Sequence, residues 1–376
     1  DTPSGGGSYV EMAFNPTQEV KSLTFKSVSQ LESFLKRHQG VSGSWGYLGG
    51  MAGMAAERMM TDTASMDAAA PQSNMMEKSA GGSLDYSETN NQVAGVDEAD
   101  IIKTDGDYIY TISGSTVYII KAYPGEDAEI VSTIDFENNN PTSLFIQDDY
   151  LAVFGNFYDN DYFKKIQFTP RQGMTFFNVY DISDRDDPDL EEEYKFEGNY
   201  FNARMTGDYV YFVTKTSPYY RPVYPTPIII ENDVIRKMPV GDIHYYNIPY
   251  RYPQFVNIHA INLDDPGEDV ESKSVAVEGG QNMYMSMENI YLTYTETISE
   301  YDLYKQVMKG LLEDELTDSD KELIEKIKAA DDEVLNQYEK DAKIIQIYMT
   351  YFNYMSQEDR DDLEDEIEEE VKEILE

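Results

Sequence analysis

The sequence predicts a mainly β fold, namely a β-propeller with an incomplete set of blades, followed by a C-terminal α-helical segment. Three observations carry this prediction: similar segments recur along the chain, partner segments alternate with them, and the apolar period becomes helical after residue 298. Units of four short antiparallel strands that recur at a period of roughly forty residues are typical of propeller blades.

The recurring segments each contain a turn followed by alternating aromatic and β-branched residues, which is the pattern of a strand. They read "GDYIYTIS" (106–113), "DDYLAVFG" (148–155), "GDYVYFVT" (207–214) and "MENIYLTY" (287–294). Strands of a second kind lie at 115–123, 174–184 and 255–265, and third strands follow at 128–136 and 190–198. We therefore expect β-propeller blades over residues 87–298, with three units and the start of a fourth.

Insertions at residues 157–173 and 216–253 interrupt the repeat. The second is rich in Pro and Tyr and is too long for a blade hairpin. We expect it to form an exposed loop with a recognition role, or a cover for one propeller face.

The N-terminal residues 1–39 are expected to form a small docking element with one strand and one helix. The stretch "VKSLTFKSVSQLESFLKRH" (20–38) predicts a strand and then a helix capped by Ser27 or Ser29. Its apolar residues share one helix face, which would pack on the blades. They are Leu31, Phe34 and Leu35.

Residues 40–86 are rich in Met, Ala, Gly and Ser, a composition that on its own predicts a linker. Methionine also suits adaptable apolar contacts, and small residues permit close approach, so we expect this segment to pack on its own domain or on a neighbouring subunit. Its thioethers could alternatively bind Cu(I). The methionines concerned are Met51, Met54, Met59, Met60, Met66, Met75 and Met76.

Residues 299–376 are expected to form three or four helices. Helix starts are indicated by "TDSD" (317–320) and by "SQED" from Ser356, and Leu323, Ile324 and Ile327 form an apolar stripe. The acidic run "QEDRDDLEDEIEEEVKEILE" predicts a solvated helix face, although a negative helix could also dock on a basic partner.

The charge of the chain restricts its partners. Asp and Glu number 71 against 29 Lys and Arg, a formal net charge of −42. Such a charge repels nucleic acid and anionic membrane surfaces, so neither is expected as a partner. Salt or bound divalent cations would relieve the self-repulsion, which fits a saline or calcium-containing medium.

The residue inventory argues against several kinds of site. The 376 residues include no cysteine and three histidines, His38, His244 and His259, none at ligand spacing. Disulfides and thiolate sites are impossible, and a zinc site is not expected. No run of eighteen apolar residues occurs, so no membrane span is expected, and G-x-S-x-G, phosphate-loop and H-E-x-x-H motifs are missing.

Carboxylate clusters are the candidate metal sites, with Ca²⁺ as the possible ion. They lie in "GVDEAD" (95–100), "FYDNDY" (157–162) and "YDISDRDD" (180–187), and none has EF-hand spacing. The alternative is that they form structural turns in which carboxylates accept backbone N–H groups and Gly95 adopts an unusual dihedral angle. The candidate ligands are Asp97, Glu98, Asp100, Asp159, Asp161, Asp181, Asp184 and Asp186.

Two stretches, "TNNQVAGVDEADIIKTDGDYIY" (89–110) and "FNVYDISDRDDPDLEEEYKFEGNYFNARMTGDYVYFVT" (177–214), resemble a family of secreted archaeal and bacterial β-propeller proteins distantly related to WD40 repeats. The resemblance covers residues 87 to 376 and includes a helical insertion after "YLTYTET". It implies a secreted or cell-surface propeller and brings no catalytic residues. In that family propeller strands resume after the helices, so this chain resembles its N-terminal portion.

From these observations we expect an extracellular structural or interaction protein that is not an enzyme and that assembles with other chains. Open propellers leave unpaired sheet edges, so we expect a partner to complete the ring. The candidates are the C-terminal half of the same precursor and a second copy of the chain. The alternative is a secreted hydrolase or carbohydrate-binding protein with its site in a central channel lined by Tyr110, Phe154 and Tyr211.

Overall fold

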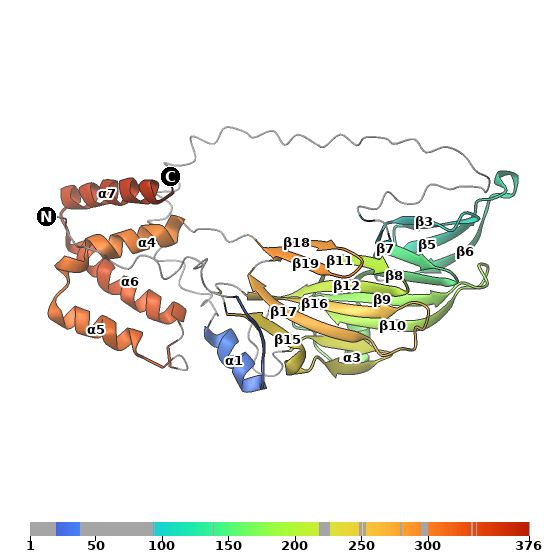
Figure 1. The fold of residues 1–376 in the computed structure, drawn as a ribbon, viewed down its shortest axis with the longest axis horizontal. Helices are drawn as coiled ribbons and strands as arrows, with labels where there is room; N and C mark the ends of the chain where they lie inside the picture. The colour runs from blue at the N-terminus through green and yellow to red at the C-terminus, as the bar shows by residue number, and fades with distance from the viewer. Residues whose placement is uncertain are drawn as a thin grey trace. The chain divides into compact units, whose positions relative to one another are not determined.

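The computed structural model describes residues 20–37, 93–217, 226–278, 280–294 and 300–375, except residues 94, 138, 248, 249, 251, 252, 332, 333 and 336. The chain divides into two compact units, a β unit that contains residues 84–295 and a helical unit that contains residues 296–376 (Figure 1). The predictions for residues 40–86, including the Met cluster, lie outside the described residues, as does His38.

Within its described residues, the β unit contains three blades, each with four successive antiparallel strands, and a two-stranded hairpin, which confirms the predicted propeller architecture. Blade 1 consists of β3 (Ile102–Thr104), β4 (Tyr108–Ser113), β5 (Thr116–Lys121) and β6 (Glu129–Asp135), with the short helix η1 (Gly125–Asp127) before β6. Blade 2 consists of β7 (Asn140–Gln147), β8 (Tyr150–Phe157), β9 (Met174–Asp181) and β10 (Asp189–Glu197). Blade 3 consists of β11 (Asn199–Thr206), β12 (Tyr209–Thr216), β16 (Pro253–Asn262) and β17 (Glu271–Glu278). The hairpin that follows consists of β18 (Gly280–Met285) and β19 (Ile290–Tyr294).

The 216–253 insertion extends the outer edges of two blades, so the prediction of an exposed loop or face cover is wrong for its described part. Strands β13 (Ile228–Glu231) and β14 (Val234–Lys237) add to β10 of blade 2. After η2 (Val240–Asp242), strand β15 (Ile243–Tyr246) pairs in parallel with β17 of blade 3. The physical reason is that an outer strand offers unpaired N–H and C=O groups, which an added strand satisfies.

The N-terminal element docks on this extension. Strand β1 (Ser22–Thr24) pairs with β15, and α1 (Val28–Arg37) begins at Ser27, whose Oγ accepts the Gln30 N–H at 3.2 Å. The predicted apolar face of α1 is buried in one cluster with Met238, Tyr250 and Phe255. Side-chain capping and this apolar stripe together explain why the segment forms a helix there.

Two apolar cores hold the blades together. Blade 2 lies between them: its residues Leu151, Val153 and Phe176 pack toward blade 1, whereas Phe154 and Phe177 pack toward blade 3. Successive side chains of a strand point to opposite faces, so the almost continuously buried strands β8 and β9 supply both cores.

The 157–173 insertion covers part of blade 2 with helix α3 (Asn160–Lys165). Beneath it, Lys195 is 1% exposed, and its Nζ lies 2.7 Å from Glu193 Oε2 and 4.2 Å from the centroid of the Tyr162 ring. Burial lowers the pKa of Lys195. The carboxylate and the aromatic ring compensate for part of the cost of burying this ammonium group.

Buried polar side chains lie between blades 2 and 3. His259 is 1% exposed, its Nδ1 lies 2.7 Å from Ser272 Oγ, and its ring stacks on Phe196 with centroids 4.0 Å apart. Burial lowers the pKa of His259 to about 3. Within the part of the chain that is described, His259 Nε2, Asn257 Oδ1 and Ser274 Oγ have no hydrogen-bond partner, which is the usual setting of an internal water.

The helical unit consists of α4 (Glu300–Leu311), η3 (Glu313–Glu315), α5 (Asp318–Lys328), α6 (Gln337–Tyr354) and α7 (Gln357–Leu375). Thr317 caps α5, and Ser356 Oγ accepts the Asp359 N–H at the start of α7, both as predicted. Ile324 is buried, but Leu323 is 46% exposed, so Leu323 does not belong to the apolar stripe. Among the described residues, no helix is both long and apolar enough to cross a membrane.

Gly155 should be intolerant of any side chain. A Cβ there would lie 2.0 Å from Asn140 O and 2.7 Å from Pro141 Cα. At this point β7 and β8 are paired next to a β-bulge. Gly155→Ala is therefore expected to lower the free energy of unfolding by roughly 2–4 kcal/mol in urea titrations. Gly125→Ala is the control, since a Cβ at Gly125 meets nothing within 4 Å. Equal stability of the two variants would contradict this account of the packing.

His259 should make the protein less stable as the pH falls. Its pKa is about 3 when folded against the ordinary 6.5 of histidine, so below pH 6.5 the unfolded chain binds the proton first and folding stability is lost. Between pH 7 and pH 5 this loss is expected to be about 2 kcal/mol.

His259→Gln should flatten the dependence in urea titrations at these pH values. His244→Gln on β15 is the matched control. An unchanged slope in His259→Gln would show that the residue is not buried as a neutral imidazole.

Candidate functional site

The acidic cluster before the first blade lies in a segment that crosses the inner edges of all three blades. We call residues 95–104 the inner strap. Its strand β2 (Asp97–Glu98) pairs with β11 of blade 3, Asp100 pairs with Leu144 on β7 of blade 2, and β3 itself is the first strand of blade 1. The strap thereby satisfies backbone groups of three successive sheets with one stretch of chain.

Ion pairs hold the two neighbouring carboxylates of strand β2 in the strap. Asp97 accepts hydrogen bonds from Lys103 Nζ at 2.7 and 2.8 Å, and the Lys103 side chain is 8% exposed. Glu98 Oε1 lies 3.1 Å from the guanidinium of Arg204 on β11. Asp100 Oδ1 accepts the N–H of Ile101, and Gly95 has φ +82°. The carboxylates of this cluster thus have the partners expected of a structural turn.

The other predicted carboxylates also bind backbone or lysine groups. Asp159 caps α3 by accepting the N–H groups of Asp161 and Tyr162, each at 2.9 Å. Asp161 pairs with Lys164 at 2.7 Å, which lowers the pKa of this exposed carboxyl group.

In the β9–β10 turn, Asp181 Oδ1 accepts the Ser183 N–H, and the hydrogen bonds of Ser183 lower the pKa of Asp181. Asp184 Oδ1 accepts the Asp186 N–H at 3.0 Å. No group of three or more His, Asp or Glu side chains placed to hold a metal ion occurs among the described residues. Calcium binding at the predicted positions therefore stays a prediction.

Two of the three aromatic residues expected in a central channel lie in the cores. Tyr110 and Phe154 are both 0% exposed, so the channel assignment is wrong for them. The Tyr110 hydroxyl donates to Asp105 Oδ2 at 2.8 Å and accepts from Arg185 Nε at 3.1 Å. Arg185 also pairs with Asp149 at 2.5 Å, so these side chains join blade 1 to blade 2. Alternation along a strand places an aromatic residue on a face but does not say whether that face meets solvent or the next blade.

Blade 1 packs one face on blade 2, and the residues of its other face reach solvent. On that second face, Ile109 pairs in register with Ile120, and Ile120 pairs with Ile130. Ile130 is 58% and Ile102 is 48% exposed. We call this surface the open face of blade 1. Its members are Ile102, Ile109, Tyr118, Ile120 and Ile130.

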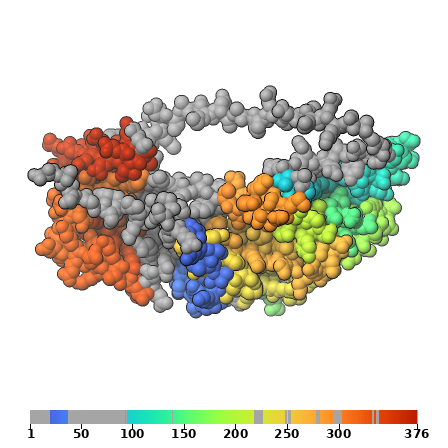
Figure 2. Space-filling model, viewed as in Figure 1, coloured from blue at the N-terminus to red at the C-terminus, as the bar shows by residue number. Residues whose placement is uncertain are grey.

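The β18–β19 hairpin presents a second such surface. One side of the hairpin packs Met283 on Val213, Val256 and Val277 of blade 3. The other side carries Tyr284 and Tyr291, which are paired in register and 47% and 50% exposed. Among the described strands only β18 pairs with β19. Figure 2 shows this hairpin at the surface of the β unit, where Figure 1 labels β18 and β19.

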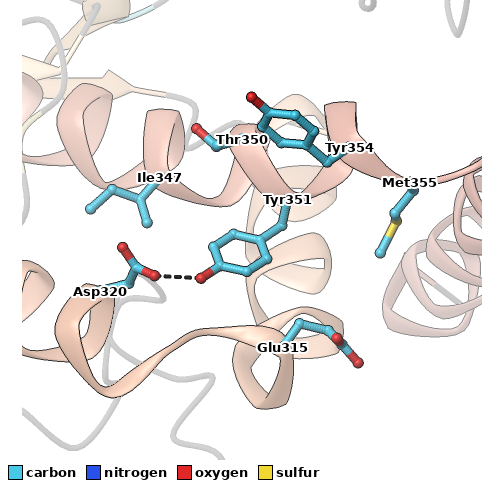
Figure 3. Close-up of a pocket in the computed structure, with 7 residues that line it drawn as sticks. All are labelled: Glu315, Asp320, Ile347, Thr350, Tyr351, Tyr354 and Met355. Atoms are coloured by element: carbon cyan, nitrogen blue, oxygen red, sulfur yellow. Dashed lines mark hydrogen bonds between the residues drawn. The ribbon is translucent and has the colours of Figure 1, made fainter.

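The helical unit contains a separate pocket with a volume of about 430 Å³ between η3, α5 and α6 (Figure 3). The Tyr351 hydroxyl donates to Asp320 and accepts the Thr317 N–H at 3.1 Å. In Figure 3 the Tyr351 ring reaches from α6 toward Asp320, and Glu315 lies on the other side of the ring in this view. The lining residues are Glu315, Asp320, Ile347, Thr350, Tyr351, Tyr354 and Met355.

Comparison with known proteins agrees with the blade architecture. A family model described as a beta propeller domain matches residues 86–366, most of the chain. The chain belongs to this beta propeller family. An uncharacterized protein of Methanocaldococcus jannaschii is 26% identical over 280 residues, which cover 72% of this chain and 38% of that protein. An uncharacterized protein of Archaeoglobus fulgidus is 26% identical over 229 residues, covering 56% and 32% of the two chains. The chain therefore spans well under half the length of both relatives.

Basic residues that form ion pairs in the β unit were missed from the sequence. Lys103 and Arg204 hold the strap, Arg185 joins blades 1 and 2, and Arg171 forms a two-bond ion pair with Glu197, which is 0% exposed. The sequence signal that could have indicated them is the scarcity of basic residues, 29 against 71 acidic ones. Lys103 also lies only six positions after Asp97. Spacing alone could not show which carboxylate each cation would meet.

The Lys103–Asp97 pair should contribute measurably to the stability of the β unit. Lys103→Met keeps the side-chain length but leaves the partly buried Asp97 carboxylate without this cation. We expect the free energy of unfolding to fall by about 2–4 kcal/mol in urea titrations. Adding Asp97→Asn should restore part of the loss, because no uncompensated charge then remains. Additive effects of the two changes would contradict a direct interaction.

Proposed function

We propose that the protein is an extracellular or cell-surface structural and interaction protein, whose propeller is completed by further blades bound to the open face of blade 1 and to the β18–β19 hairpin. The observation that carries the proposal is that blade 2 buries both its faces, whereas blade 1 has an isoleucine row about half exposed at Ile102 and Ile130. A half-exposed apolar sheet face indicates a binding surface.

The two surfaces would bind the same kind of partner by different means. The open face of blade 1 offers side chains to the face of a neighbouring sheet. The β19 edge offers backbone groups, and a completing strand would pair with them and pack on Tyr284 and Tyr291. A partner with both an apolar blade face and a free strand therefore fits best. The first candidate is the C-terminal part of the same precursor, and the second is another copy of this chain.

The extracellular location is supported by composition. A net charge of −42 suits a surface protein in a saline medium. The beta propeller family supports the scaffold role, since propellers present loops and faces to partners on a rigid ring.

The proposal is tested by isolating the protein from its native cells and measuring the mass of every co-purifying polypeptide. We expect blade-containing material in addition to the 43.0 kDa expected for residues 1–376. Ile130→Arg, on a side chain that is 58% exposed, should reduce its recovery at least about tenfold without unfolding the chain.

Val234→Arg on β14 is the matched control, because Val234 is also 58% exposed but lies outside both surfaces. Equal loss of partner in both variants would contradict the proposal. So would recovery of a stable 43.0 kDa monomer with no further blades in any preparation.

A further inference from the structure

The pocket of the helical unit has the chemistry of a site for a cationic side chain. Between residues 300 and 376 there are 26 Asp and Glu against 9 Lys and Arg, so the unit attracts cations as a whole. Diffuse charge of this kind selects no particular ligand. The pocket adds a defined shape, and its 430 Å³ lie within the range of roughly 300–1,000 Å³ usual for ligand sites.

Aromatic rings and carboxylates converge in this pocket. Tyr354 is 87% exposed, an unusual degree of exposure for a large ring, while Ile347 and Met355 are half-buried and give the pocket apolar walls. Glu315 is exposed at the pocket and Asp320 lies across the Tyr351 ring from it in Figure 3. A tyrosine face attracts cations through its ring quadrupole, and a nearby carboxylate adds a charge-assisted hydrogen bond.

The Asp320 carboxylate is held in the charged form that a cation requires. Hydrogen bonds from the Thr317 and Tyr351 hydroxyls lower the pKa of Asp320. The same bonds fix the position of Asp320 and of the Tyr351 ring, so two of the groups lining the pocket are arranged before any ligand binds. Preorganisation of this kind lowers the entropic cost of binding.

We propose that this pocket binds an arginine side chain of a partner polypeptide, with the guanidinium group stacked on Tyr354 and paired with Glu315. Arginine fits better than lysine because its planar guanidinium stacks on a ring and meets a carboxylate with two parallel N–H donors. The long aliphatic stem would lie against Ile347 and Met355. This inference concerns the helical unit alone and does not depend on completion of the propeller.

The test is direct binding of a short peptide to the full-length chain. The probe is a labelled Gly-Ser peptide with two arginines and a central leucine, and its control is the same peptide with citrulline in place of arginine. Fluorescence anisotropy in about 0.15 M salt keeps long-range attraction small. We expect the arginine peptide to bind and the citrulline peptide to bind at least about tenfold more weakly.

Variants identify the site. Glu315→Gln and Tyr354→Ala should each weaken arginine-peptide binding at least about fivefold. Glu369→Gln, at an exposed position of α7, removes the same charge outside the pocket and should leave binding unchanged. Circular dichroism at 222 nm checks that each variant keeps its helices.

Three outcomes would overturn the proposal. The first is equal weakening by Glu315→Gln and Glu369→Gln, which would show attraction to the acidic surface in general. The second is equal binding of free arginine amide and the peptide, which would indicate a small-molecule site. The third is no binding of the arginine peptide at millimolar concentration. None of these outcomes concerns the open face of blade 1. If the arginine peptide fails to bind, the proposed completion of the propeller is unaffected and is tested by the co-purification experiment.

Discussion

The architecture of the β unit depends on the inner strap and the ion pairs that hold it. The first strand of each propeller blade lies near the centre of the propeller. Without the strap, this strand would leave a row of backbone N–H and C=O groups unpaired. Residues 95–104 pair in turn with β11, β7 and β4, so a single stretch of chain fixes the spacing of blades 3, 2 and 1. Lys103 of β3 neutralises Asp97, and Arg204 of β11 neutralises Glu98. Without these cations the acidic strap would face a chain that is already strongly negative.

The blades themselves are held by apolar packing and joined by a few polar contacts. Blade 2 is apolar on both faces and acts as the centre of the packing. At its margins, Arg185 binds the buried Tyr110 hydroxyl of blade 1 and the exposed Asp149. The Arg171–Glu197 pair joins the 157–173 insertion to β10. Each such contact costs desolvation, but its geometry fixes how the joined segments meet, which apolar packing alone specifies less strictly.

The sequence predicted strands and blades well because alternation along a strand is a local signal. The turns "GDY" and "DDY" together with the alternating residues placed β4, β8 and β12 correctly. Pairing between distant segments is not local. The 216–253 insertion looked like a loop because it is rich in Pro and Tyr, yet the unpaired outer edges of blades 2 and 3 recruit its strands. Similarly, nothing in the sequence around Tyr110 and Phe154 distinguishes a residue that lines a channel from one buried between blades.

The same limit applies to the candidate sites. The acidic turns were visible in the sequence, but their partners, such as Lys103 for Asp97 and the Tyr162 N–H for Asp159, depend on the folded geometry. The pocket of the helical unit gave no sequence signal, because Glu315 and Tyr354 are far apart in the chain and meet only when α6 packs against η3 and α5.

The attachment of β1 also has a mechanical consequence. This strand holds the outermost rim of blade 3 through only three paired residues, whereas β12 and β16 share eight. Tension on the chain ahead of Ser22 would therefore peel β1 from β15 before the longer blade strands separate, and the buried face of α1 would then resist further extension. The blades would keep their packing while the released chain lengthened, so the N-terminal element would yield first and protect the ring from rupture.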